Sequence, residues 1–216
     1  MDFINKKEKE LDLKQKDYIE FIKTTLRNRM SEALYRHSLG TYSYSLMLAE
    51  KYTKQEPENK KNDQLFRISV AALLHDYGKI FDSGELQELA AAEKLKISRF
   101  ERNCSQIIHS FAAPYLLKRD FGIVDKAISH AVKFHTTGSC RMNIIDRIIY
   151  IADKVEQTRS YEGIEDLRKL SMENIDLCLL EVYKSNIIYV ITRNYLMHPD
   201  TSKIWNNICG GYKNAT

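Results

Sequence analysis

The stretch QLFRISVAALLHDYGK, residues 64–79, is apolar on nearly every side of a helix at its C-terminal end and then places His75 beside Asp76. A helix that is hydrophobic all round belongs in the interior of a protein. The stretch therefore predicts a central, buried helix that ends in an imidazole and a carboxylate. Because a His-Asp pair alone has little specificity, its meaning depends on whether other histidines and aspartates converge on it.

The rest of the chain also follows the three-to-four-residue apolar spacing of helices. From about residue 17 the pattern is helical, and the apolar positions between Leu26 and Leu48 follow one helix face. The same spacing returns at residues 103–122, 123–138, 142–160 and 175–190. No alternating strand pattern, repeat or interior linker is found. The sequence therefore predicts an all-α, single-domain helical bundle over residues 16–210, preceded by a charged tail or helical extension over residues 1–15.

Composition and charge exclude several classes of protein. The net charge of +4 is only mildly basic, and no basic stretch is interleaved with aromatic residues, so nucleic-acid binding is not expected. No apolar stretch approaches the roughly 20 residues that a membrane span needs. The four cysteines lie far apart and form no CxxC pair, which argues against a zinc ribbon and against a disulfide framework. A cytoplasmic protein without membrane contact is the simplest prediction.

Six acidic or imidazole side chains fall on apolar, inward faces of five different predicted helices. They are His37, His75, Asp76, His109, His135 and Asp153. A single inward histidine is more often a hydrogen-bonded core residue than a metal ligand, and a lone aspartate could pair with an arginine. Six together favour metal binding, because a buried carboxylate without a partner is very costly. Imidazole nitrogens and carboxylate oxygens suit transition metals, and one carboxylate can bridge two ions.

Two further histidines do not share this pattern. His130 lies roughly 140° around the helix axis from His135, on the side of Lys126 and Lys133, so it is predicted to be a surface residue. His198 precedes Pro199 in a loop and is predicted to lie at the mouth of a site rather than to bind metal.

Five segments, taken in order, resemble the motifs of the HD-domain metal-dependent phosphohydrolases. They are YRHSLG (35–40), ALLHDYGK (72–79), IIHS (107–110), KFHTTG (133–138) and YIADKVEQTRSYEG (150–163). More narrowly, they resemble the bacterial YqeK family of symmetrical diadenosine tetraphosphate hydrolases. The HTTG segment followed by ADKxExxR is much more specific than the His-Asp pair alone, and the likeness runs from about residue 18 to 208.

The resemblance implies a helical fold with a two-iron site, and its ligands would be the same six residues. Asp76 would be the bridging ligand. Small departures occur at Tyr77-Gly78-Lys79, where the family tends to have Ile-Ala-Lys, and at Gln157, where it commonly has proline. Neither departure touches a proposed ligand, although both affect the expected fit of a substrate. The donor types themselves would also accept zinc, manganese or nickel.

The expected activity is hydrolysis of diadenosine tetraphosphate to two ADP by a hydroxide formed between two metal ions, held roughly 3.5–4 Å apart. Besides Asp76, the predicted catalytic residues are Lys79 and Arg159, whose charges would neutralise phosphate. Arg159 suits bidentate phosphate contact. The alternative is that Lys79 and Arg159 are solvated surface cations without a role in catalysis.

Family resemblance also implies nucleotide contacts beyond the metal ligands. The expected substrate-binding residues are His37, Gly40, Asp76, Asn103, Gln106, Thr136, Asp153, Arg159, His198 and Thr201. Two alternatives stay open: an HD-type nucleotidase or phosphodiesterase acting on another nucleotide, and a non-catalytic module that senses ADP. The expected partner is a small nucleotide. The sequence does not set the oligomeric state, and a homodimer stays open.

Overall fold

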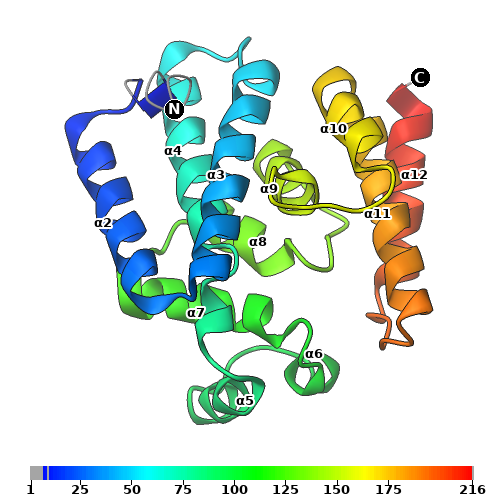
Figure 1. Ribbon diagram of the computed structural model, residues 1–216. Helices are drawn as coiled ribbons and strands as arrows, with labels where there is room; N and C mark the ends of the chain where they lie inside the picture. The colour runs from blue at the N-terminus through cyan, green and yellow to red at the C-terminus, as the bar shows by residue number, and fades with distance from the viewer. Residues whose placement is uncertain (1–6, 9, 216) are drawn as a thin grey trace.

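The computed structural model describes residues 7, 8 and 10–215 and is built of helices within that part of the chain (Figure 1). The labelled elements are α2 (Leu13–Arg29), α3 (Glu32–Tyr52), α4 (Glu58–Leu74), η1 (Tyr77–Ile80), α5 (Ser83–Ala92), α6 (Arg99–Asn103), α7 (Ile108–Phe121), α8 (Lys126–Phe134), α9 (Ile144–Val155), α10 (Ile164–Glu173), α11 (Ile175–Thr192) and α12 (Thr201–Ala215). The described chain holds no strand. The prediction of an all-α fold is confirmed.

Helix α4 is the central helix that its sequence predicts. From Ile68 to Leu74 its residues are essentially inaccessible to solvent. It packs against α3 on one side and against α8 and α9 on others. Helix α9 is the second buried helix, with Ile148 to Ala152 also fully covered. His75 and Asp76, which follow the last turn of α4, are also inaccessible to solvent.

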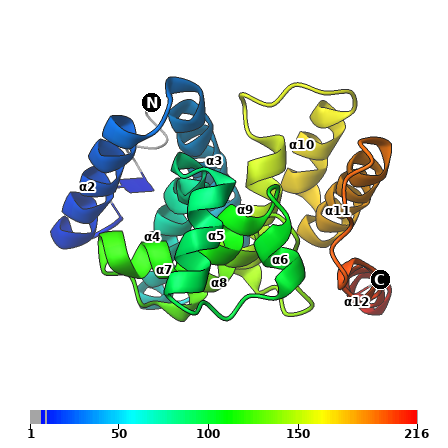
Figure 2. The same ribbon diagram turned by 90° about the horizontal axis from the view of Figure 1, so that it is seen from below.

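The other helices cover this centre from three sides. Helix α2 lies along α3 and α4, and α7 packs against α8 and η1. Helices α5 and α6 lie beyond α7, as the view from below shows (Figure 2). Helix α11 packs against both α10 and α12, and this group meets the rest of the molecule mainly through α9. The chain therefore brings the ends of α4, α7, α8 and α9 close to the middle of α3.

One predicted feature is wrong: the apolar stripe between Leu26 and Leu48 does not lie on one continuous helix. Helix α2 ends at Arg29, and Met30 adopts an extended conformation. Ser31 then caps α3, since its hydroxyl accepts a hydrogen bond from the Leu34 N–H at 3.3 Å. A serine N-cap supplies an acceptor to a helix start that otherwise has none, and apolar spacing alone does not reveal such a break.

The segment after α9 also differs from the prediction. A helix was expected to run to about Ser160, but α9 ends at Val155 and residues 156–163 form a turn. Gly163 lies in the left-handed region with φ 80° and leads into α10, which the sequence analysis did not anticipate. The sequence predicts no helix between about Ser160 and Ile175, the stretch in which α10 lies.

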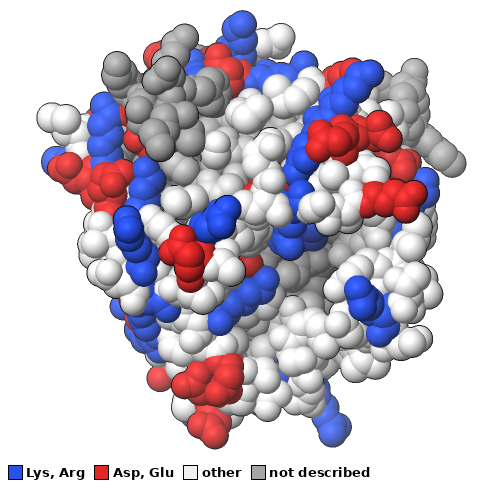
Figure 3. Space-filling view, in the orientation of Figure 1, with Lys and Arg blue, Asp and Glu red and all other residues white. Residues whose placement is uncertain are grey.

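The predicted tail over residues 1–15 lies partly outside the described residues, at positions 1–6 and 9. Within the described part, Leu11 is buried and Asp12 caps α2 by accepting from the Gln15 N–H at 2.8 Å. No helix of the described chain combines the length and the apolar character that crossing a bilayer requires. On the face shown in Figure 3, basic and acidic side chains are interspersed.

Candidate metal centre

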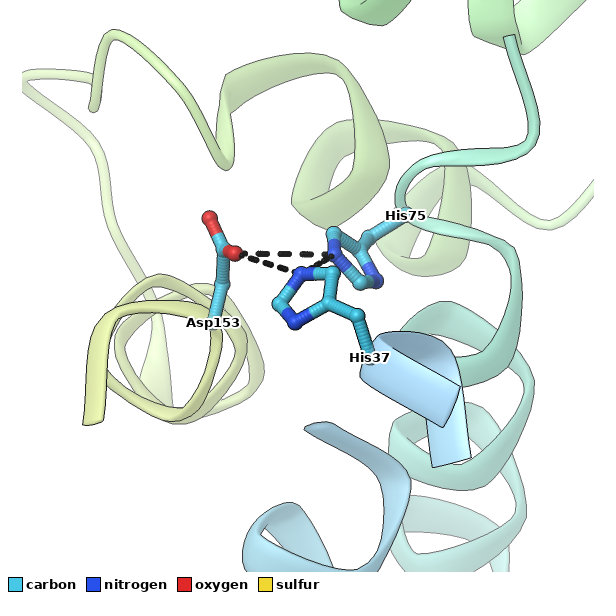
Figure 4. A group of neighbouring side chains, drawn as sticks. All are labelled: His37, His75 and Asp153. Atoms are coloured by element: carbon cyan, nitrogen blue, oxygen red, sulfur yellow. Dashed lines mark hydrogen bonds and ion pairs between the residues drawn. The ribbon is translucent and has the colours of Figure 1, made fainter. Parts of the chain in front are cut away.

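The six residues singled out in the sequence come together where five helices meet. His37 lies within α3, His75 and Asp76 follow the last turn of α4, and Asp153 lies near the end of α9. His109 lies in the first turn of α7, and His135 directly follows α8. Figure 4 shows three of these side chains, from α3, α4 and α9, pointing toward one another.

Three of the side chains form the first half of the cluster. The Nε2 atom of His37 lies 3.1 Å from Nε2 of His75 and 3.0 Å from Oδ1 of Asp153. The Nε2 atom of His75 lies 3.6 Å from the same carboxylate oxygen. Two imidazole nitrogens and one carboxylate oxygen thus face a common point, and their spacing would suit a single metal ion.

Asp76 joins this half of the cluster to the other. Its Oδ2 atom lies 3.6 Å from Nε2 of His37 and 3.5 Å from Nε2 of His75. Its Oδ1 atom lies 3.2 Å from Nε2 of His135 and 3.4 Å from Nε2 of His109. The two oxygens of one carboxylate therefore face two different pairs of histidines.

The cluster is almost closed to solvent. His75, Asp76 and His135 are at most 1% exposed, while His109 and Asp153 are 4% exposed. Burial opposes the charged form of both carboxyl groups, yet the histidines and Lys154 hold the pKa of Asp76 and of Asp153 well below the usual range. The centre therefore holds two buried negative charges that need positive charge close by.

The same balance appears in the histidines. Burial alone lowers the pKa of His75, but the carboxylates of Asp76 and Asp153 outweigh it and raise this pKa to about 9. Burial lowers the pKa of His135 to about 4 and also lowers that of His109. Either a proton or a metal ion bound to the cluster would supply the positive charge that Asp76 and Asp153 favour.

Outer hydrogen bonds set which ring nitrogen faces the cluster. The Nδ1 atom of His75 lies 2.8 Å from the Ala72 carbonyl oxygen, and that of His135 lies 2.7 Å from the Val132 carbonyl oxygen. A carbonyl only accepts, so Nδ1 carries the proton and donates it. In a neutral imidazole the lone pair is then on Nε2, the atom that faces the cluster. This orientation and tautomer fit a metal site.

Three basic side chains surround the carboxylates. Lys79, on η1, donates to Oδ2 of Asp76 at 2.7 Å. Arg159 donates from Nη2 to Oδ1 of Asp153 at 2.8 Å, and its Nε donates to the Asp153 carbonyl oxygen at 2.9 Å. Lys154, which the sequence analysis did not single out, contacts Oδ2 of Asp153 and donates to the His135 carbonyl oxygen at 3.2 Å. All three also line a cavity.

That cavity has a volume of about 650 Å³ and leads from the cluster toward the loop between α11 and α12. Its size is typical of a small-molecule site. Of the predicted nucleotide contacts outside the ligand set, Gln106, Thr136, His198 and Thr201 line it, together with Arg159. The cluster residues His109, His135 and Asp153 form its inner end.

Two predicted contacts lie elsewhere. Asn103 ends α6 as an exposed residue and does not line the cavity. Gly40 does not line it either. A Cβ atom on Gly40 would lie 2.1 Å from Oε2 of Glu156, so the buried carboxylate requires a residue without a side chain here, and contact of Gly40 with a ligand stays a prediction.

The prediction for His130 needs a small correction. His130 is only partly exposed, because its Nδ1 lies 2.9 Å from Oδ1 of the buried Asp146. It stands apart from the metal cluster, as predicted, but it is not a free surface residue. Tyr77 and Gln157, the departures from the family pattern, do not line the cavity. Tyr77 is buried and donates its hydroxyl to Asp120 at 2.9 Å.

Comparison with known proteins adds to this geometry. Residues 34–158, which include all six cluster residues, match the HD domain. The chain belongs to the HD domain family. The HD-domain protein is also similar to a crystal structure of a predicted HD superfamily hydrolase involved in NAD metabolism from Clostridium acetobutylicum. That likeness has a TM-score of 0.78 and 30% identity and covers 88% of this chain and 96% of that one. The predicted fold type is confirmed.

Curated relatives of this HD-domain protein carry a more specific name. The Bacillus subtilis protein named bis(5'-nucleosyl)-tetraphosphatase, symmetrical, is 27% identical over 86% of this chain and 95% of its own length. A protein of the same name from Halalkalibacterium halodurans is 25% identical over 85% of this chain and 92% of its own. The resemblance noted from the motifs is confirmed, and it extends over nearly the full length of these relatives.

Proposed function

We propose that this HD-domain protein is a metal-dependent hydrolase that cleaves symmetrical dinucleoside tetraphosphates, with diadenosine tetraphosphate and one water giving two ADP. The observation that carries the proposal is the buried cluster of four histidines and two aspartates at the inner end of a cation-lined cavity. The names of the full-length relatives support the choice of substrate.

Two transition-metal ions would be held by the six side chains. His37, His75 and Asp153 would hold one, and His109 with His135 would hold the other. Asp76 would serve both, since each of its oxygens faces one pair of histidines. Iron is our choice from the family resemblance, and the mixed nitrogen and oxygen donors fit it. Bound ions of this kind activate water and neutralise phosphate charge.

The chain itself would position the substrate around this centre. Arg159 and Lys79 would bind phosphate oxygens, and Lys154 is a third cation on the same cavity wall. Phosphoryl transfer depends chiefly on positioning and charge neutralisation, so cations beside the reacting phosphates are what it needs. His198 and Thr201 would contact the nucleoside. Gln106 and Thr136 line the same cavity and would also contact the nucleotide.

A panel of nucleotides tests the substrate and the reaction together. Metal-loaded protein is incubated with diadenosine tetraphosphate, with asymmetric and shorter dinucleotides, with mononucleotides and with cyclic nucleotides, and the products are separated by chromatography. The expected result is ADP alone from diadenosine tetraphosphate. In water labelled with ¹⁸O, one of the two ADP molecules should carry the label. A mixture of AMP and ATP contradicts symmetrical cleavage.

The same panel separates the two alternatives. A nucleotidase or phosphodiesterase would prefer a mononucleotide or cyclic nucleotide, and an ADP-sensing module would bind ADP without turnover of any compound. For the whole protein we propose a cytoplasmic enzyme, in keeping with four cysteines that form no disulfide. A homodimer stays a prediction that sedimentation can test.

A further inference from the structure

Glu156 lies directly behind the metal cluster and is fully buried. Its Oε1 atom lies 3.0 Å from Nδ1 of His37, on the side of the imidazole away from the other ligands. The residue belongs to the ADKVEQ segment, three positions after Asp153, but it is not one of the predicted ligands. Burying a carboxylate in this position is energetically costly unless hydrogen-bond donors satisfy its oxygens.

The turn after α9 supplies those donors. Glu156 is the C-terminal cap residue of α9, and its side chain accepts from the Thr158 N–H at 2.7 Å and from the Thr158 hydroxyl. Arg168, on α10, donates to the carbonyl oxygens of Val155, Glu156 and Arg159 at 2.7–2.9 Å. Thr158 therefore holds the carboxylate in one orientation, and Arg168 holds the turn that carries it.

The opposite wall is shaped to admit this carboxylate. Gly40 lies three residues after His37, on the same face of α3, and any Cβ there would come within 2.1 Å of Oε2 and 2.9 Å of Cδ of Glu156. Because the contact would involve a side chain held from the other side, it could not be relieved by a small movement. The glycine and the glutamate thus fit each other as a pair.

His37 needs an acceptor from outside its own helix, and the reason is its position. His75 and His135 follow the last turns of α4 and α8, where carbonyl oxygens lack helical partners and can accept from Nδ1. His37 lies inside α3, where the preceding carbonyl oxygens already accept from helix N–H groups. An external acceptor is the way to hold its Nδ1 proton.

We propose that Glu156 is the positioning residue for His37, holding the ring with Nδ1–H toward the carboxylate and Nε2 toward the metal. The inference rests on the proposed metal centre. A carboxylate behind a metal-bound imidazole fixes its tautomer and raises its basicity. Gly40 serves the same purpose indirectly, by leaving the space that Glu156 occupies.

Cobalt binding tests the proposal through a readout other than turnover. The protein is stripped of metal and titrated with Co²⁺ against a competing chelator, and the visible absorption bands report the coordination. The Glu156→Ala variant should bind one ion about 10- to 100-fold more weakly, with altered bands, while the other ion keeps its affinity within about threefold. Glu156→Gln should recover part of the loss, because its amide oxygen can still accept from Nδ1.

A double-mutant cycle separates positioning from a general packing defect. Gly40→Ala should weaken the same ion in the natural background but should add no further loss in the Glu156→Ala background, where the clash is absent. Additive losses, or an unchanged Co²⁺ affinity and spectrum in Glu156→Ala, would overturn the proposal. If the unaltered protein binds no Co²⁺, the metal centre itself fails, which is a different outcome.

Discussion

At the scale of single residues, the fully buried Asp76 is the residue on which the proposed chemistry depends most. Each of its oxygens faces a different pair of histidines. Asp76→Ala should therefore abolish ADP formation and lower the content of both metal ions. Elemental analysis of the purified variant, with chromatographic assay of products, checks both effects. Retention of one ion at full occupancy would show that Asp76 does not serve both halves of the cluster.

His130 provides the matched control for that variant. It is a histidine in the same domain, but its hydrogen bond goes to Asp146 and not to the cluster. His130→Asn keeps a side-chain N–H where Nδ1 lies, so metal content and turnover should match those of the unaltered protein. Damage equal to that of Asp76→Ala would mean that loss of fold, and not loss of a ligand, explains both results.

Arg159 is half-exposed, contacts Asp153 and lines the cavity. Arg159→Ala should lower kcat/KM for diadenosine tetraphosphate about a hundredfold, because a charge-assisted contact to phosphate is commonly worth a few kcal/mol. The metal content should stay the same. Arg36, exposed on α3 and outside the cavity, is the control position. If Arg159→Ala keeps full activity, Lys79 is the next residue to test.

At the scale of elements, Asp125 anchors the start of α8, the helix that carries His135 at its end. Its carboxylate accepts from the backbone N–H groups of Ala127 and Ile128 and from Arg67. Although burial alone would raise its pKa, these donors lower it. The stabilisation is therefore fully present above the unfolded pKa of about 4 and is lost as the pH falls through the lower, folded pKa.

Urea unfolding measures this effect. At pH 7 Asp125→Ala should lower the free energy of unfolding by about 1 kcal/mol, the usual loss for an N-cap. The difference between the two proteins should narrow as the pH falls toward 3, since protonation of Asp125 removes its charge. A difference that stays constant over this range would show that the charge of Asp125 contributes nothing.

Two glycines with the same backbone geometry should respond differently to alanine. Gly122 ends α7 with φ 69° and open space around it, while Gly138 has φ 70° and a Cβ there would lie 2.9 Å from the Tyr183 ring. Gly122→Ala should lose about 1 kcal/mol from backbone strain alone. Gly138→Ala should lose more, measured as the free energy of unfolding. Equal losses would mean that Tyr183 moves aside freely.

The sequence predicts those parts of the fold that depend on burial of apolar residues. It does not predict the helix boundaries that are set by hydrogen bonds within turns. The central position of α4 follows from apolar residues on all its sides, and so does the convergence of the six cluster residues. The break at Ser31 and the early end of α9 depend on single hydrogen bonds, from Leu34 to Ser31 and from Thr158 to Glu156. The spacing of apolar residues does not reveal such hydrogen bonds.

The surroundings of Gly40 could not be predicted for a related reason. A glycine one turn after a cluster histidine suggests room for a ligand, but which atom fills that room depends on a segment 116 residues later in the chain. Lys154 follows Asp153 directly, and because neighbouring residues of a helix point in different directions, apolar spacing does not bring these two side chains together. In the structure both residues belong to the last turn of α9, and both line the cavity.

At the scale of the whole molecule, the cluster ties five helices together, so metal binding should stabilise the entire fold. An ion present at a thousand times its dissociation constant adds about 4 kcal/mol, which corresponds to a rise in Tm of roughly 10 °C for a chain of this size. A strong chelator should lower Tm accordingly, as followed by circular dichroism. The Asp76→Ala variant is the control and should respond little; an unaffected Tm in the unaltered protein would contradict the coupling.

The metal content of the purified protein tests the central claim most directly. Elemental analysis by mass spectrometry, set against protein concentration from amino-acid analysis, should give close to two transition-metal ions per chain after anaerobic reconstitution with iron. The four histidines and two aspartates supply more donors than one ion needs, and Asp76 faces both halves. Protein that stays free of metal after reconstitution, while folded and monodisperse, would contradict the account.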